Sequence, residues 1–278
     1  MVKDGIVVQS IGFKKYLPVG KPNIAIEYLN QWGIDEIILL DISASRAGRK
    51  PLYEMVKQAS LKCYVPLTVG GGITKIAHIK ELMHCGSDKI SINQTALNNP
   101  KFITEAANVF GCQCVVVSID SMKDGANYKV YDHLQKRTLK MTPAELAKIS
   151  ENAGAGEILI NSVDRDGSYL GYDIDLINSV CEHTSIPVIV CGGAKNASDF
   201  LEVFNKTNTS AAAAGNFFHF TEHSVNITKA NVIKQADIRL ETFTNYQDNK
   251  FDKTFRLLKK NDITLEEMLF VRIEKEVI

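Results

Sequence analysis

Acidic side chains stand at the ends of short β-branched runs in this sequence. Asp41, Asp120 and Asp166 follow three such runs. Carboxylates in these positions can transfer protons to and from a substrate, although a lone Asp after a strand more often caps the next helix. We expect general acid/base chemistry at Asp120, and we favour Asp166 over Asp164 in "DRDG" as a further site residue.

Two Gly-Gly turns are each followed, one strand later, by an Asn. Backbone N–H groups of such turns can approach an anion closely, and an Asn that opens a helix adds further donors. This arrangement predicts two phosphate cradles, and hence a substrate with a phosphate at each end. The alternative is that the glycines only permit tight turns. The residues are Gly71, Gly72 and Asn93 in the first half and Gly192, Gly193, Gly215 and Asn216 in the second.

The runs that carry these residues alternate with helix-like segments. Strands that are apolar on both faces and alternate with helices predict a parallel sheet. The repeated spacing is typical of a (β/α)₈ barrel or of a doubly wound sheet. The predicted strands are 36–42, 65–71, 89–94, 114–120, 157–163, 187–193 and 210–216.

An internal repeat favours the barrel. An acid, a Gly-Gly turn and an Asn after a strand recur in the same order in both halves, with 21 residues from Gly72 to Asn93 and 23 from Gly193 to Asn216. Half-barrel duplication predicts this register, and it places all strand-end residues at one mouth. We therefore expect a (β/α)₈ barrel over 1–237.

The duplication also predicts a strand like "CVVVSID" immediately before "VKDG", where this sequence has only Met1. We expect seven full strands around a gap at the first position, with Val7 and Val8 in a short hairpin. Residues 238–278 lose the alternation and predict a helical extension, with a Thr264 and Glu267 capping box.

Charged residues also begin three of the predicted strands. Glu36, Lys89 and Glu157 stand at their first positions and hence at the N-terminal face of the barrel. Such charges are commonly solvated. The alternative is a ring of paired charges that closes this end as a gate.

Composition predicts an ordinary globular protein. With 45% hydrophobic and 23% charged residues the chain can bury a full core, and 32 basic residues balance 32 acidic ones. We expect no nucleic-acid or membrane partner, a cytoplasmic location and six reduced cysteines. His219 and His223 have metal-like spacing but lack a third ligand, so neither a metal nor a cofactor is expected. The basic loop 45–50 is either a phosphate-handling lid or merely exposed.

These motifs resemble the cyclase subunit of imidazole glycerol phosphate synthase. "VKDG", "LLDISAS", "TVGGGI", "DKISIN", "GAGEILINSVDRDG", "SIPVIVCGGA" and "FFHF" match that family in order over roughly residues 2–220. The resemblance implies a (β/α)₈ barrel that takes ammonia from a class I glutaminase docked on the N-terminal face. At the other mouth the family cleaves and cyclises a bisphosphorylated ribulosyl aminoimidazole carboxamide.

The resemblance also implies roles for particular residues. Asp120 corresponds to a catalytic acid/base, and Asp41 and Asp166 correspond to substrate contacts. The two sets of Gly and Asn correspond to phosphate sites, and the charged set at the N-terminal face corresponds to an ammonia gate.

The sequence departs from the family at several site positions. Met1 stands where the family has a second catalytic Asp, and Gln9 replaces a substrate-binding Lys. Gln94 replaces a Thr and Asn216 a Ser at the two phosphate sites. Loss of one of two proton-transfer groups removes orders of magnitude in rate.

These departures favour a divergent paralogue over the histidine-pathway enzyme. Such paralogues accompany a glutaminase and a sugar amidotransferase in bacterial surface-glycan pathways, where they supply ammonia for an acetamidino sugar. The genuine cyclase of histidine biosynthesis is the first alternative, and a non-catalytic scaffold that docks the glutaminase is the second.

Overall fold

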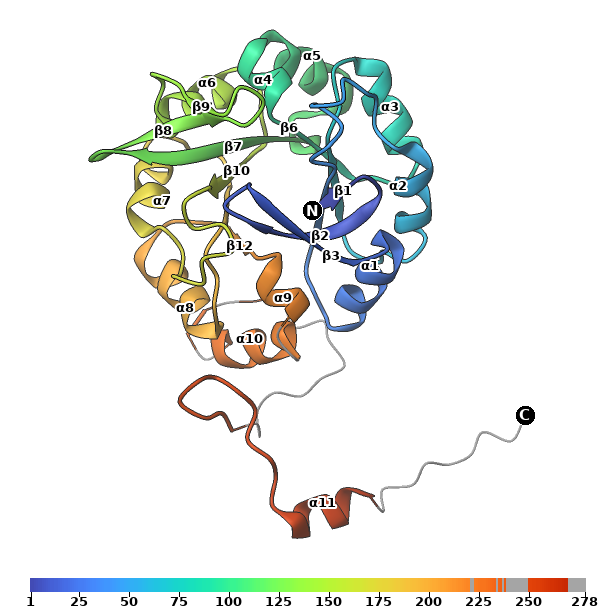
Figure 1. Ribbon diagram of the computed structural model, residues 1–278, viewed down its shortest axis with the longest axis vertical. Helices are drawn as coiled ribbons and strands as arrows, with labels where there is room; N and C mark the ends of the chain where they lie inside the picture. The colour runs from blue at the N-terminus through green and yellow to red at the C-terminus, as the bar shows by residue number, and fades with distance from the viewer. Residues whose placement is uncertain (221–222, 234, 237, 239–249, 270–278) are drawn as a thin grey trace.

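Seven parallel strands form one sheet that is surrounded by a ring of helices (Figure 1). The computed structural model describes residues 1–220, 223–233, 235–236, 238 and 250–269. The order of the strands, β12-β11-β10-β7-β6-β5-β4, follows the chain, as a (β/α)₈ barrel requires. The predicted fold class and all seven predicted strands are confirmed. The strands are β4 (Ile37–Leu40), β5 (Leu67–Gly70), β6 (Lys89–Ile92), β7 (Val115–Asp124), β10 (Glu157–Ser162), β11 (Val188–Cys191) and β12 (Ala211–Ala213).

The main core lies between the sheet and the helices, because the strands are apolar on both faces. Ile90 of β6 and Ile158 of β10 are fully buried against the helical layer. A smaller cluster of Val116, Leu159 and Ile189 lies inside the sheet. The helices are α1 (Pro22–Gln31), α2 (Tyr53–Ser60), α3 (Ile76–His84), α4 (Gln94–Asn98), α5 (Lys101–Phe110), α6 (Pro143–Asn152), α7 (Ile174–Cys181), α8 (Ala197–Lys206), α9 (Asn216–Phe220) and α10 (Ser224–Val232).

An antiparallel hairpin lies across the middle of the ring in Figure 1. It consists of β2 (Ile6–Ile11) and β3 (Lys15–Gly20), preceded by the short β1 (Val2–Lys3). Val2 is fully buried and makes an isolated parallel bridge with Asp41. Among the described residues, no full strand pairs with the free edges of β12 and β4. The predictions of a gap and of Val7 and Val8 in a hairpin are confirmed.

A second hairpin, which we did not predict, extends past the ring of helices in Figure 1. β7 continues beyond its barrel portion and pairs with β8 (Asn127–Asp132), which pairs with β9 (Arg137–Thr138). Gly125 and Ala126 form the two-residue connection between Asp124 and Asn127, and Gly125 has a positive φ of 63°. A Gly at the first of the two connecting positions is the signal for this turn.

The C-terminal segment contains helix α11 (Asp262–Leu269). Our prediction that Thr264 and Glu267 start this helix is wrong, because the helix begins two residues earlier. Asn261 caps it instead, since its side-chain oxygen accepts a hydrogen bond from the Thr264 N–H at 2.7 Å. Residues 239–249 and 270–278 of the expected extension lie outside the described residues. Among the described helices, none has both the length and the apolar character needed to cross a membrane.

Two glycine turns at the strand ends hold backbones in close contact. Gly193 has φ of 101°, and a Cβ built there would lie 2.0 Å from the carbonyl oxygen of Gly171. Gly72 has φ of 71°, and its Cβ would lie 2.4 Å from the Arg49 carbonyl oxygen. Any larger residue is therefore both strained and obstructed at these two positions.

We expect Gly193→Ala to destabilise the protein by at least about 2 kcal/mol, because positive φ and the Gly171 contact both oppose the added methyl group. For a chain of this size, that corresponds to a fall of roughly 4–8 °C in melting temperature. The control is Gly20→Ala, where nothing lies within 4 Å of the built Cβ and φ is not positive. Thermal unfolding followed by circular dichroism measures both, and equal melting temperatures would contradict the argument.

Candidate active site

A cavity of about 1610 Å³ occupies the inside of the sheet and reaches both of its ends. Glu36 and Glu157 line it at the N-terminal end, and Asp120 lines it at the C-terminal mouth. All ten residues predicted to be catalytic or to bind substrate or phosphate line this cavity, whereas Gly70 and Asp164, which the sequence also placed at the mouth, do not. The ten residues are Asp41, Gly71, Gly72, Asn93, Asp120, Asp166, Gly192, Gly193, Gly215 and Asn216.

Asp120 is held at the mouth by hydrogen bonds from three different elements. Its Oδ2 accepts from Asn93 Nδ2 at 3.0 Å and lies 3.1 Å from His133 Nδ1. Its Oδ1 accepts from Asn161 Nδ2 at 3.1 Å. The side chain is only 6% exposed, so these donors replace the water that a buried carboxylate needs.

The first predicted cradle is arranged differently from the expectation. Asn93 was expected to face a phosphate, but its side-chain amide binds Asp120 instead. Gln94 donates to Asp132 at 3.2 Å and is also turned away from the Gly-Gly loop. The donors that this cradle can offer to an anion are therefore the backbone N–H groups of its loop.

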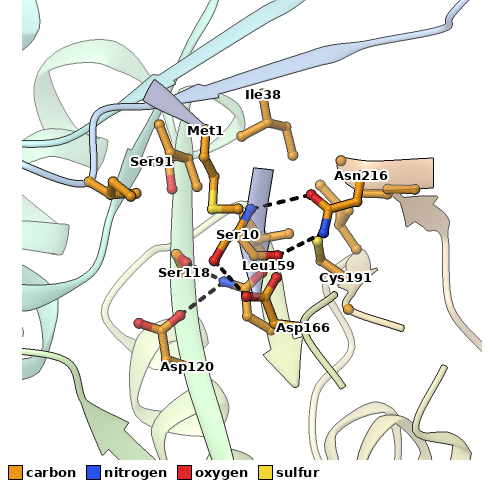
Figure 2. A pocket seen from close by; sticks show the side chains of 18 of the residues that line it. Met1, Ser10, Ile38, Ser91, Ser118, Asp120, Leu159, Asp166, Cys191 and Asn216 are labelled. Atoms are coloured by element: carbon orange, nitrogen blue, oxygen red, sulfur yellow. Dashed lines mark hydrogen bonds between the residues drawn. The ribbon is translucent and has the colours of Figure 1, made fainter. Parts of the chain in front are cut away.

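The second predicted cradle is tied to the β2–β3 hairpin. Asn216 Oδ1 accepts from the Ser10 N–H at 3.3 Å, and its Nδ2 donates to the Ser10 carbonyl at 2.7 Å. Figure 2 shows Ser10 between Asn216 and Asp166. Within the described residues, the N–H groups of Gly193 and Ala194 have no hydrogen-bond acceptor, so backbone donors remain here while the Asn216 side chain is engaged.

Asp166 holds the same hairpin by its side chain. Its Oδ2 accepts from Ser10 Oγ at 2.6 Å and from the Phe13 N–H at 3.2 Å. Burial raises the pKa of the Asp166 carboxyl above its ordinary value, against the opposing effect of the Ser10 hydrogen bond. Asp164 points elsewhere and accepts from the Lys123 N–H. The structure thus brings Asp166, and not Asp164, to the cavity.

Asp41 is paired with a cation from the basic loop. Arg49 Nη2 lies 2.7 Å from Asp41 Oδ2 and donates to Ser43 Oγ at 3.0 Å. Ser43 also donates to Asp41 Oδ1 from both its hydroxyl and its N–H. Arg46 of the same loop lines the cavity. The loop at 45–50 is therefore attached to the mouth by Arg49 and presents a second cation to it.

The charged residues at the N-terminal end of the barrel lie in direct contact. Lys89 Nζ donates to Glu157 Oε1 at 2.7 Å and to Glu36 Oε2 at 3.1 Å. Burial alone would lower the pKa of Lys89, but the hydrogen bonds with the two carboxylates outweigh it and leave that pKa above its ordinary value. Glu157 Oε2 is buried and has no hydrogen-bond partner among the described residues.

Metal donors are not gathered in the described part of the chain. It contains no group of three His, Cys, Asp or Glu side chains placed to hold a metal ion. Burial lowers the pKa of His219 to about 4, which keeps this imidazole neutral. The cysteines among these residues form no disulfide.

Sequence reasoning missed several residues that surround Asp120 and Asp166. His133, Asn161 and Ser10 bind these carboxylates, but none follows a predicted strand directly. Asn161 could have been found, because it lies one residue before the end of β10 and shares its face with Glu157. His133 belongs to the hairpin that the sequence analysis did not predict.

Comparison with known proteins assigns the family. A barrel with carboxylates and glycine turns at its C-terminal mouth defines an enzyme of the (β/α)₈ class. The sequence matches the family model described as histidine biosynthesis protein over residues 2–224, and the chain belongs to this family. The resemblance drawn from the motifs is thereby confirmed.

The most similar relatives identify the branch of the family. A Vibrio vulnificus protein, provisionally named imidazole glycerol phosphate synthase subunit hisF2, is 42% identical over 91% of this chain and 93% of the relative. Subunit HisF of that synthase from Bacillus cereus is 42% identical over 86% and 95%. HisF from Lactococcus lactis is 40% identical over 84% and 91%. The chain is a HisF-like enzyme.

We expect Asp166→Ala to release the β2–β3 hairpin from the mouth. Loss of the hydrogen bonds from Ser10 and Phe13 removes about 1–3 kcal/mol of local stability, which corresponds to roughly 5- to 150-fold faster amide exchange at Phe13. Hydrogen exchange with mass spectrometry over residues 6–20 measures this. Asp164→Ala is the matched control, and equal protection in both variants would show that Asp166 does not anchor the hairpin.

Proposed function

We propose that this chain is the ammonia-using synthase subunit of a glutamine-dependent enzyme. The observation that carries this proposal is the cavity that reaches from the charged cluster at one end of the sheet to the carboxylates at the other. Its middle is lined by Ile38, Leu159 and Ile189. An apolar passage suits neutral ammonia, because entry of an ion would carry a desolvation cost.

The charged cluster has the chemistry of an entry gate. Lys89 binds one oxygen of Glu157, which leaves the buried Oε2 of that side chain without a donor among the described residues. An unsatisfied carboxylate oxygen is an acceptor for the N–H bonds of an incoming ammonia molecule. A class I glutaminase docked at this N-terminal face is the partner that this role requires.

The reaction that we favour is amidation of a sugar in bacterial surface-glycan biosynthesis, with a sugar amidotransferase as a further partner. Sequence identity does not distinguish this role from histidine biosynthesis, because the hisF2 relative and the Bacillus cereus relative are each 42% identical to this chain. The mouth supports the paralogue instead. Asn93 and Asn216 use their side chains internally, and Gln9 and Gln94 stand where the resemblance implies Lys and Thr.

The second candidate is the cyclase of histidine biosynthesis. It is supported by the backbone N–H groups of Gly193 and Ala194, which lack acceptors in the described structure and can bind a phosphate. We propose a phosphorylated small-molecule substrate under both readings. A glutaminase-docking scaffold is the outcome if the mouth performs no chemistry.

We expect Lys89→Ala to impair turnover with glutamine about 10- to 100-fold while leaving turnover with ammonium salts near the wild-type rate. The two charge-assisted hydrogen bonds that it removes contribute about 1.5–3 kcal/mol to closing the gate. Both rates are measured with the glutaminase partner present. Lys62→Ala is the control, since Lys62 pairs with Glu27 on the surface. Equal losses with both nitrogen sources would make Lys89 a structural residue.

Binding of the bisphosphorylated ribulosyl compound distinguishes the two reactions. We expect weak binding without cyclisation, because Gln9 removes a cation and Gln94 and Asn216 remove hydroxyl donors, each costing about 0.5–3 kcal/mol. Calorimetric titration and an ammonium-dependent turnover assay measure this. Submicromolar binding with formation of imidazole glycerol phosphate would reject the paralogue and establish the cyclase.

A further inference from the structure

An imidazole lies beside the buried carboxylate at the mouth of the barrel. His133 follows β8, thirteen positions after Asp120, and its Nδ1 lies 3.1 Å from Asp120 Oδ2. The His133 side chain is 24% exposed and lines the cavity. With Nδ1 on the carboxylate, the nitrogen left for other partners is Nε2, to which no described residue is hydrogen-bonded.

The buried carboxylate of Asp132 holds the turn that carries His133 in place. The Asp132 carboxylate is buried, and its Oδ1 accepts from the N–H groups of Leu134 and Gln135 at 2.9 and 3.1 Å. Gln94 donates to the same oxygen at 3.2 Å. Gln94 is one of the positions where this chain departs from the resembled family, so the departure supports the turn rather than a phosphate.

Asp120 is poorly placed to move protons by itself. Asn93 and Asn161 already donate to its two oxygens, and His133 approaches Oδ2 as a third partner. A carboxylate held by three partners suits the orientation of an imidazole and the stabilisation of its protonated form. Of these three partners, His133 has a second ring nitrogen, Nε2, that remains available to exchange a proton.

We propose that His133 is the proton-transfer residue of this site and that Asp120 orients it. Nε2 takes a proton from the nitrogen of ammonia after that nitrogen has bonded to an electrophilic carbon of the substrate. The N–H bonding pair stays on the nitrogen, and the imidazole becomes an imidazolium paired with Asp120. The same proton then passes from Nε2 to the substrate atom that leaves with its bonding pair, which restores the neutral imidazole. The inference rests on the proposed function, because it assigns the ammonia-dependent step.

Other charged and titratable groups line this mouth and influence how turnover depends on pH. They come from the β2–β3 hairpin, the loop after β4, β7, β8, the turn before β9 and the loop after β10. They include Tyr16, Arg46, Asp41, Asp120, Tyr131, Lys136 and Asp166.

His133→Asn tests the role directly. The Asn amide can still donate to Asp120 from near the Nδ1 position, but it has no titratable atom. We expect kcat for ammonium-dependent turnover to fall about 10²–10⁴-fold, with KM and melting temperature within twofold and about 2 °C of wild type. The acidic limb of the kcat profile against pH should also disappear. His183→Asn is the matched control, since His183 Nδ1 binds the Ser179 carbonyl on α7.

A His133→Asn variant that keeps the wild-type rate and the acidic limb would overturn the inference while leaving the proposed function standing. Nitrogen NMR of the imidazole gives a second arm that needs no substrate. We expect the Nδ1–H tautomer in the wild type and its loss in Asp120→Ala; an Nε2–H tautomer in the wild type overturns the inference. A wild-type chain that consumes no substrate with ammonium contradicts the proposed function, and the NMR arm then decides whether the His133–Asp120 pair stands.

Discussion

The burial of one carboxylate organises the mouth of this barrel. A charged group with 6% of its side chain exposed must be surrounded by donors, and Asp120 draws them from separate elements. Asn93 comes from the end of β6, Asn161 from β10 and His133 from the turn after β8. These partners fix the positions of three neighbouring segments, and the residues that the sequence analysis assigned to phosphate binding are partly used for this purpose.

At the opposite end of the sheet, the central group is a cation and its partners are carboxylates. Lys89 is the partly buried cation there, and the carboxylates of Glu36 and Glu157 contact it. Between the two polar ends the interior contains Val116, Leu159 and Ile189. The barrel is therefore polar at both ends and apolar in the middle.

The sequence predicted the elements of this site better than the contacts within it. The strands were predictable because their apolar runs are buried on both faces, and Lys89 and Asn93 were correctly placed at the two ends of β6. The partner of each side chain was not predictable. Asn93 binds Asp120, and Asn216 binds the backbone of Ser10, more than 200 positions away. Such pairings depend on how the hairpins fold over the mouth, which strand periodicity does not encode.

His133 was missed for a related reason. The β7–β8 hairpin that precedes it has its own turn signal, a Gly at position 125, but the run that ends in Asp120 was read as finished at that residue. In the structure β7 continues without a break from Val115 to Asp124. Because the strand was expected to end at Asp120, the residues that follow it were not predicted to return to the site.

The continuity of β7 has a mechanical consequence for the enzyme. Val116 and Val117 of this strand lie between β6 and β10, whereas the portion from Met122 to Asp124 pairs only with β8. Asp120 pairs with Asn161 of β10, and His133 follows β8 beyond the pair of Val130 with Ser121. The ladder from Ser121 to Asp124 and the hydrogen bond from Tyr128 to Asp173 therefore hold the segment that carries His133 against the barrel.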